Sequence, residues 1–133
     1  MSNIPRVLTI YEAFGRGDVP TILSHLADQV EWEQGAVDVG IPWLKPRQGR
    51  AEVPAFFEAM GALEIRRFQP RTLLERDNVV VAIIGLEFVV KSTAHTVKED
   101  DEVHIWRFAD DGKVASFCHK VDTHQHWLAL QPT

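Results

Sequence analysis

The residues best suited to chemistry lie in two runs near the C-terminal end of the chain. Glu102, His104 and Trp106 occupy alternate positions, and His119 and Asp122 follow in the next apolar stretch. Alternate residues of a strand share one face, so the first three side chains point the same way. Histidine exchanges protons near neutral pH, and a nearby carboxylate can set its charge. We therefore expect acid–base chemistry, with His104 as the leading catalytic group and Asp122 as the second.

A turn signal at 109–112, Ala-Asp-Asp-Gly, joins the two runs into a hairpin, because glycine accepts a positive φ there. Pairing Phe108 with Lys113 sets three facing pairs on one sheet face: Glu102 with His119, His104 with Phe117, and Trp106 with Ala115. In this register Glu102 favours the charged form of His119, whereas His104 lies in an apolar setting that keeps it neutral. The alternative for His104 is a core histidine satisfied by one hydrogen bond.

Other polar residues could have either a structural or a functional role. Asp122 could do no more than cap a short C-terminal helix. Glu87, a lone carboxylate in an apolar strand, is a candidate base if it faces inward. His124 and His126, with His119 nearby, could suggest a metal, but histidines near a chain end usually face solvent, and no ligand spacing is recognisable. We expect no metal site.

Three helices must position these groups. Apolar residues recur at helical spacing in 7–14, 19–26 and 53–60. Glycines follow the first and third of these segments, and Asp18 stands before the second as an N-cap. The pattern predicts three amphipathic helices with marked ends.

The rest of the chain reads as strands: 30–32, 63–75, 79–90, 102–108 and 113–122. The strand 79–90 is apolar on both faces, and the acidic run 99–102 is interpreted as a solvated strand entry. An antiparallel sheet twists and curls, so helices on its concave side leave a cavity. We predict an α+β fold, a cone-shaped curled antiparallel sheet with three N-terminal helices enclosing a pocket.

Large side chains in these segments are expected to line the pocket and to contact a substrate, although each could equally be ordinary core. The loop 35–48, with two prolines and a tryptophan, is expected to cap the mouth of the pocket. The proposed substrate-binding residues are Tyr11, Phe14, Trp32, Trp43, Phe56, Phe57, Met60, Trp106, Phe117 and His119.

The chain as a whole fits a single domain, 1–133, because 133 residues of which 45% are hydrophobic can bury one core. A net charge of −5 opposes binding to nucleic acid or to anionic membranes. No apolar run is long enough to span a membrane, and no secretory signal opens the chain, so we expect a cytoplasmic protein. Without a glycine-rich phosphate loop we expect no cofactor.

Several segments resemble the SnoaL-like family. The runs IYEAFGRGD at 10–18 and LADQVEW at 26–32 resemble its opening, GRAE at 49–52 its third helix, and VHIWRF at 103–108 with DGKV at 111–114 its last hairpin. The match extends from 7 to 122. This family belongs to the nuclear transport factor 2-like superfamily, together with ketosteroid isomerases and limonene epoxide hydrolases.

The resemblance to ketosteroid isomerase matches three functional residues of that enzyme to positions of this sequence. The isomerase base falls on Gln34, which cannot accept a proton, and its oxyanion tyrosine falls on Ile10, one residue before Tyr11. The second oxyanion donor falls on His104. Glu33 could replace the base, but strand alternation points it to the opposite face. The chain is therefore not expected to be a true ketosteroid isomerase. The Arg-x-Asp triplet of the epoxide hydrolases is missing from 79–90, and Asp122 resembles the acid of the cyclases.

The resemblance implies a cofactor-free isomerase, cyclase or hydratase that acts on a small apolar or polyketide-like molecule through His104 and Asp122. The alternative is a non-catalytic ligand-binding or assembly module of the same fold. We expect a homodimer formed through the open sheet face, because 79–90 is apolar on both sides and needs cover.

Overall fold

The computed structural model describes residues 2–33 and 35–132. Gln34, the position that corresponds to the isomerase base, lies outside them. The elements in chain order are α1 (Ile4–Gly15), α2 (Val19–Ser24), β1 (Leu26–Trp32), η1 (Pro42–Leu44), β2 (Arg47–Gln48), η2 (Arg50–Glu52), α3 (Val53–Met60), β3 (Leu63–Arg76), β4 (Val79–Val90), β5 (Thr96–Phe108), β6 (Val114–Lys120) and α4 (Thr123–Leu130).

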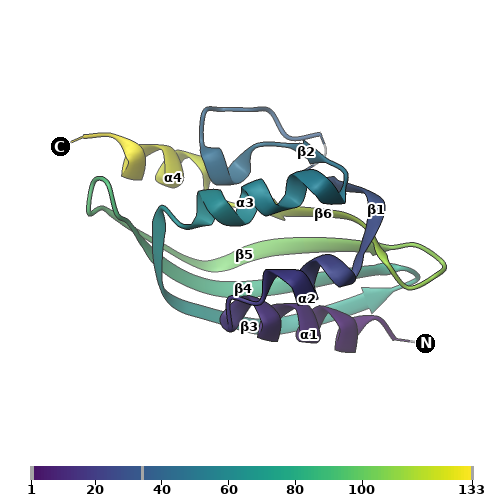
Figure 1. Ribbon diagram of the computed structural model, residues 1–133. Helices are drawn as coiled ribbons and strands as arrows, with labels where there is room; N and C mark the ends of the chain where they lie inside the picture. Colours follow the sequence, from purple (N-terminus) through teal and green to yellow (C-terminus); the bar gives the residue numbers. More distant parts are fainter. Residues whose placement is uncertain (1, 34, 133) are drawn as a thin grey trace.

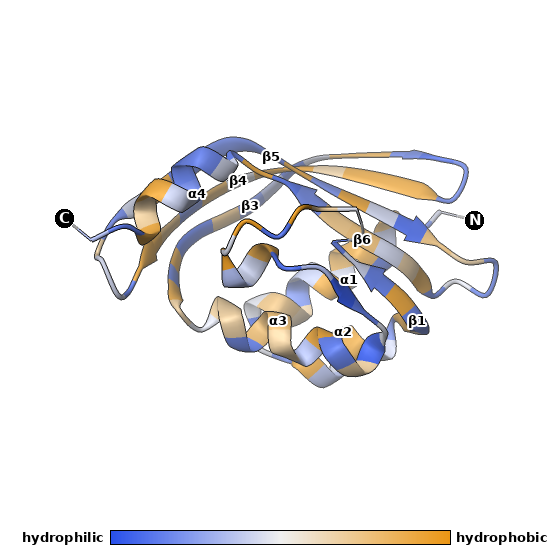
Figure 2. Ribbon diagram, turned by 90° about the horizontal axis from the view of Figure 1, so that it is seen from above, coloured by the Kyte–Doolittle hydropathy of each residue, from blue (hydrophilic) through white to orange (hydrophobic). Residues whose placement is uncertain are grey.

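The three predicted helices are present, and each turns its apolar stripe towards the sheet. Helix α1 buries Val7, Ile10 and Tyr11, and α3 buries Val53 and Phe56. Helices α1, α2 and α3 lie together on one side of the sheet, as the two views in Figure 1 and Figure 2 show. No helix in the described part of the chain combines the length and apolar character needed to cross a membrane.

The sheet has six strands in the order β2-β1-β6-β5-β4-β3. Neighbours from β3 to β6 are antiparallel, but β1 runs parallel to β6, so the sheet is mixed rather than wholly antiparallel as predicted. No hairpin connects β1 with β6, so nothing in the connection forces an antiparallel pair. The predicted α+β architecture, a curled sheet with helices on its concave side, is confirmed.

The register between β5 and β6 differs by two residues from the predicted one. Trp106 faces Phe117 and His104 faces His119. Phe108 faces Val114 rather than Lys113, which gives one residue of the shift, and an irregularity between Arg107 and Phe108 gives the second. In the turn Gly112 adopts the expected positive φ of 83°. Because a shift of two keeps each side chain on its original face, these residues still point together, as predicted.

The acidic run is partly buried, contrary to the prediction of a solvated strand entry. Glu102 pairs with Ile84 of β4, and Glu99 pairs with Leu86, so three steps along β5 match two along β4. This extra residue on β5 is a β-bulge, which turns both glutamates to the inner face. Asp100 and Asp101 remain exposed.

Hydrophobic residues dominate β4 (Figure 2), and its two faces are buried to different degrees. Val80 and Ile84 on the concave face are fully buried, whereas Val81 and Ile83 on the convex face are partly exposed. Glu87 contacts Lys98, its neighbour on β5, with 3.7 Å between Oε1 and Nζ. Glu87 is therefore not a cavity-facing base.

Candidate active site

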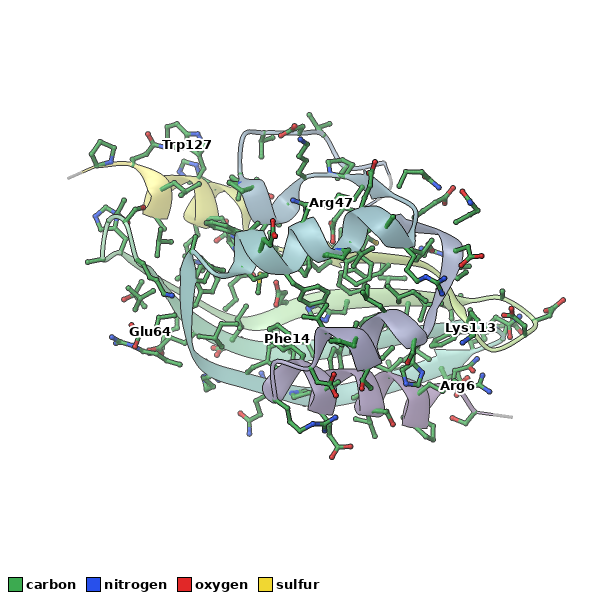
Figure 3. The ribbon with its side chains drawn as sticks, viewed as in Figure 1. Arg6, Phe14, Arg47, Glu64, Lys113 and Trp127 are labelled. Carbon is green, nitrogen blue, oxygen red and sulfur yellow. The ribbon has the colours of Figure 1, made fainter. Side chains whose placement is uncertain are left out.

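A cavity of about 70 Å³ lies between the helices and the concave face of the sheet. Because a cavity of roughly 10–15 Å³ can hold one water, this cavity is large enough for a small ligand. Side chains from the helices and the sheet fill the space around it (Figure 3), and Phe14 reaches in from α1. All ten residues expected at the wall line the cavity, together with Ile10, Ile22, Leu63, Ile65, Phe68, Leu86, Phe88, Glu102, His104 and His126.

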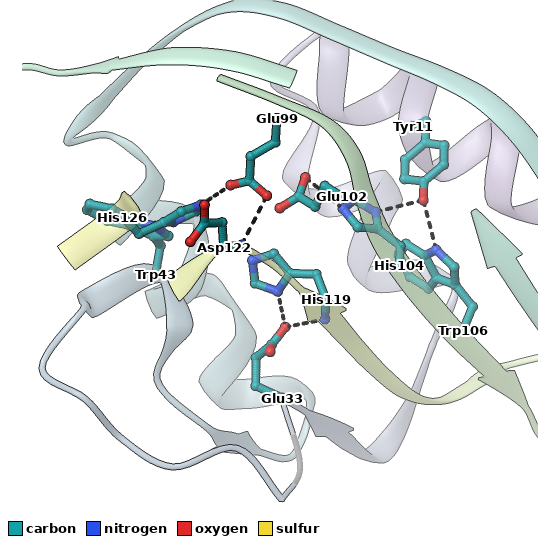
Figure 4. Close-up of polar contacts among 10 residues, drawn as sticks. All are labelled: Tyr11, Glu33, Trp43, Glu99, Glu102, His104, Trp106, His119, Asp122 and His126. Atoms are coloured by element: carbon teal, nitrogen blue, oxygen red, sulfur yellow. Dashed lines mark hydrogen bonds and ion pairs between the residues drawn. The ribbon is translucent and has the colours of Figure 1, made fainter. Parts of the chain in front are cut away.

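The apolar wall contains a series of hydrogen-bonded side chains that includes Tyr11 and His104 (Figure 4). The Trp106 indole Nε1–H donates to the Tyr11 hydroxyl oxygen at 3.0 Å. The Tyr11 oxygen lies 2.8 Å from Nδ1 of His104, and Nε2 of His104 lies 3.3 Å from Oε2 of Glu102. Helix α1 supplies Tyr11, and alternation along β5 supplies the other three residues.

The partners of His104 determine where its proton lies. A carboxylate accepts hydrogen bonds, so Nε2 carries the proton donated to Glu102, and Nδ1 accepts from the Tyr11 hydroxyl. Burial lowers the pKa of His104 below its ordinary value, outweighing Glu102. Burial also raises the pKa of Tyr11 well above its usual range. Burial alone would raise the pKa of Glu102, but the hydrogen bond from His104 lowers it overall. At neutral pH the result is a tyrosine, an imidazole and a carboxylate in series.

A second polar group joins His119 to Glu33. Both the main-chain N–H and ring Nδ1 of His119 hydrogen-bond to Oε1 of Glu33 (Figure 4), the main-chain bond being 3.0 Å long. The prediction that Glu33 points away was wrong. Its φ of 63° breaks the strand alternation just after β1, and Glu33 is 2% exposed. Such a conformation costs about 1–3 kcal/mol in a residue other than glycine, so surrounding contacts must maintain it.

The pKa of His119 is shifted in the opposite direction from that of His104. Burial alone would lower the pKa of His119, but the hydrogen bond and charge of Glu33 raise it above the ordinary value. The two imidazole rings lie on neighbouring strands with 5.8 Å between their centroids. The cavity wall therefore holds two histidines whose pKa values are shifted in opposite directions.

A third polar cluster, of Trp43, His126 and Glu99, closes the end of the cavity near α4. The Trp43 indole N–H donates to Nδ1 of His126 at 3.0 Å, and Nε2 of His126 hydrogen-bonds to Glu99. His126 is 1% exposed, so the expectation that it faces solvent was wrong. Helix α4 forms and turns His126 inward, on the same side as Ala129. Trp43 thus covers one end of the cavity.

The structure gives Asp122 a capping role. Its carboxylate accepts from the main-chain N–H of Gln125 at 3.2 Å at the start of α4, and the residue is exposed. Asp122 does not line the cavity, so it is not carried into the proposed chemistry. Within residues 2–33 and 35–132, no three His, Cys, Asp or Glu side chains are grouped to hold a metal ion.

Sequence reasoning did not assign roles to Glu33, Glu99 or His126. The sequence does contain a signal for the burial of His126. If a helix follows Asp122, His126 and Ala129 are three residues apart and lie on the same face of that helix. For Glu99 and Glu33 the cause is backbone geometry, a bulge and a positive φ, that residue types do not reveal.

Comparison with known proteins gives a family and a fold. The family model described as SnoaL-like domain matches residues 7–117. Among curated proteins, no sequence matches this chain.

Solved structures resemble the whole chain. An NTF2-like protein of unknown function from Burkholderia pseudomallei is 26% identical, with a TM-score of 0.85, over 98% of this chain and 99% of that one. TerC, co-crystallised with polyporic acid, is 25% identical with a TM-score of 0.78 over 96% of each chain. A Pseudomonas putida protein provisionally assigned as a polyketide cyclase is 17% identical, with a TM-score of 0.78 over 98% and 99% of the two chains, which shows the shared fold.

Proposed function

Because this chain belongs to the SnoaL-like domain family, we propose that it binds a small apolar molecule in the aromatic cavity and isomerises or cyclises it by acid–base chemistry without a cofactor. The observation that carries this proposal is the buried series Tyr11–His104–Glu102, the only such hydroxyl–imidazole–carboxylate series among the described cavity residues.

The proposed step is a proton transfer at the Tyr11 oxygen. A lone pair of that oxygen takes a proton from the substrate while the hydroxyl proton passes to Nδ1 of His104. The imidazolium that forms is stabilised by Glu102, 3.3 Å from Nε2. The Trp106 N–H, 3.0 Å from the Tyr11 oxygen, stabilises negative charge on that oxygen during the transfer. The same logic joins hydroxyl, imidazole and carboxylate in hydrolase triads.

The cavity wall supports an apolar, flat substrate. Trp32 and Trp106 pack around Phe117, each with 4.4 Å between its ring centroid and that of Phe117, and Phe56 lies 5.3 Å from Trp32. Aromatic walls of this kind favour ring-containing ligands. TerC, which shares the fold at 25% identity, was crystallised with polyporic acid, so that compound is included in the test below.

Binding is tested by thermal melting of the wild type with polyporic acid and 2-tetralone, a flat apolar ketone. A ligand bound by the folded state raises the melting temperature. Conversion is tested by NMR, as deuterium incorporation into 2-tetralone in D₂O. We expect wild-type exchange, and a loss of about 10²–10⁴-fold in Tyr11→Phe. His124→Gln, a change at an exposed histidine, is the matched control. Binding without exchange by the wild type favours the non-catalytic ligand-binding alternative.

We also propose a homodimer through the convex sheet face. Val81 and Ile83 of β4 lie there beside Val103 and Ile105 of β5, all partly exposed. Leu74 of β3, 59% exposed, extends this apolar strip. Sedimentation is expected to give twice the 15.1 kDa mass of the chain.

The matched variants are Ile83→Glu, expected to sediment as a monomer, and Leu8→Glu, expected to leave the dimer intact. Leu8 is also exposed and apolar but lies on α1. A monomeric wild type contradicts the proposal. The cytoplasmic location stays a prediction.

A further inference from the structure

We propose that His119, held by Glu33, is a second catalytic group that donates a proton to the oxygen of an enolisable carbonyl compound. This inference rests on the proposed function and deepens it by naming the substrate class, compounds with a C–H next to a carbonyl group.

The geometry leaves one nitrogen of His119 available. Nδ1 and the main-chain N–H both bond to Glu33, whereas Nε2 has no hydrogen-bond partner among the residues the structure describes. In Figure 4 Nε2 lies on the side of the ring away from Glu33. The side chain is 8% exposed and lines the cavity. An accessible ring nitrogen that has no protein partner in a cavity wall is a position where a ligand atom can bind.

The ring of His119 is fixed in place. Phe117 stacks against it with 5.6 Å between centroids, and Phe56 meets it edge-on at 6.1 Å. Glu33 accepts two hydrogen bonds from the same residue, so ring rotation would break one of them. A fixed donor is what stabilisation of a developing negative charge requires.

The charges around His119 favour a proton on Nε2. Glu33 contacts the ring, and Glu102 and Glu99 lie on the facing strand β5, so three carboxylates favour the imidazolium. The neighbouring His104 on β5 faces His119 across the sheet, and burial lowers the pKa of His104. The surroundings shift the pKa values of the two histidines in opposite directions. His104 is therefore suited to act as the base, and His119 to act as the acid.

The two groups complete one balanced step. The C–H proton of the substrate goes to the Tyr11 oxygen, and the tyrosine proton goes to Nδ1 of His104. The C–H electron pair forms the C=C bond of an enol, and the carbonyl π pair moves to oxygen. That oxygen takes the Nε2 proton of His119, which keeps its Nδ1 proton on Glu33. Return of a proton to the same carbon exchanges it with solvent, and where the enol is conjugated with a second C=C bond, return to the far carbon of that system gives an isomer; no oxidant or reductant is needed.

His119 can recover its proton from solvent. It lines not only the cavity but also a surface groove, with Ala36, Val39 and Val121. The loop after β1 forms one side of this groove. The acid is thus placed between the reacting molecule and water.

The test is the pH profile of deuterium incorporation into 2-tetralone by the wild type, His119→Gln and Glu33→Gln. We expect His119→Gln to lower the plateau rate about 10²–10⁴-fold. Glu33→Gln retains His119, so its rate should fall less, and the alkaline limb of its profile should move to lower pH. Glu31→Gln, two residues earlier and outside the cavity lining, is the matched control and should match the wild type.

A second measurement does not depend on the His119 variant folding. ¹⁵N NMR of the histidine rings should show that His119 is still protonated on both nitrogens at pH values above about 6.5, the ordinary histidine pKa. Glu33→Gln should lower that pKa.

The outcomes separate the two proposals. If the wild type exchanges, Tyr11→Phe does not, and both His119→Gln and Glu33→Gln keep the wild-type rate and profile, this inference is overturned and the proposed function stands. If the wild type does not exchange 2-tetralone, both are overturned. A His119 ring that is neutral at pH of about 6.5 also overturns the inference.

Discussion

Replacing Tyr11 with phenylalanine should destabilise the fold by about 2–6 kcal/mol. The change removes one oxygen and leaves two buried groups without their partner, the Trp106 indole N–H and Nδ1 of His104. Each unsatisfied buried group costs about 1–3 kcal/mol, and the ring itself is kept. For a chain of this length, 1 kcal/mol corresponds to roughly 3–5 °C, so the melting temperature should fall by roughly 6–30 °C.

The assay is urea unfolding of the wild type, Tyr11→Phe, His104→Phe and the double variant. Because Tyr11 and His104 are in contact, the cycle should give a coupling free energy of about 0.5–3 kcal/mol. A Tyr11→Phe protein within about 0.5 kcal/mol of the wild type, the range of ordinary surface substitutions, would refute the hydrogen-bonded series. Zero coupling between the two positions would refute it as well.

Three further predictions concern single contacts. Asp122→Ala should lower the free energy of unfolding by about 1 kcal/mol through loss of the α4 cap; urea unfolding measures this, and a loss of ligand binding would show that the aspartate does more than cap. Because the pKa of His119 is raised in the folded state, its stabilising effect is complete below pH of about 6.5 and is lost as the pH rises through the raised value. The difference in free energy of unfolding between the wild type and Glu33→Gln should therefore become smaller as the pH rises. Urea unfolding at several pH values measures it, and a difference that grows with pH would contradict the raised pKa of His119. Trp43→Phe removes the donor to buried His126 and should cost about 1–3 kcal/mol; unchanged thermal melting would show that this end of the cavity is held by other contacts.

The helices and the core strands could be predicted because their residue spacing is strong. The stripe containing Val7 and Ile10 has helical period, and 79–90 predicts β4 with its observed bounds. The cavity-facing aromatic residues follow from the same periodicities combined with the family resemblance. Spacing decides which face a side chain occupies, and that was enough to place Tyr11, His104 and His119 at one wall.

Partners across strands could not be predicted, because they depend on local backbone irregularities. A turn one residue longer than predicted and the irregularity before Phe108 together moved the register by two residues, and the bulge after Glu99 brought a second glutamate inward. The positive φ of Glu33 reversed its expected direction. Each departure depends on one or two backbone angles rather than on residue type.

These same irregularities build the polar part of the site. Glu33 reaches His119, and Glu99 reaches His126, through the backbone features that break the regular alternation. The apolar wall of the cavity was therefore accessible to sequence reasoning, whereas the carboxylate partners of its histidines were not. Positions at which local rules fail are often those at which function is located.

The most direct test of the central claim is the acid limb of deuterium incorporation into 2-tetralone by the wild-type protein. Proton abstraction through Tyr11 requires His104 to be unprotonated, and burial lowers the pKa of His104. The rate should rise with pH to a plateau, with a midpoint below the ordinary histidine value of about 6.5. A rate that rises in proportion to hydroxide with no midpoint, or a profile that Tyr11→Phe reproduces, would contradict the account.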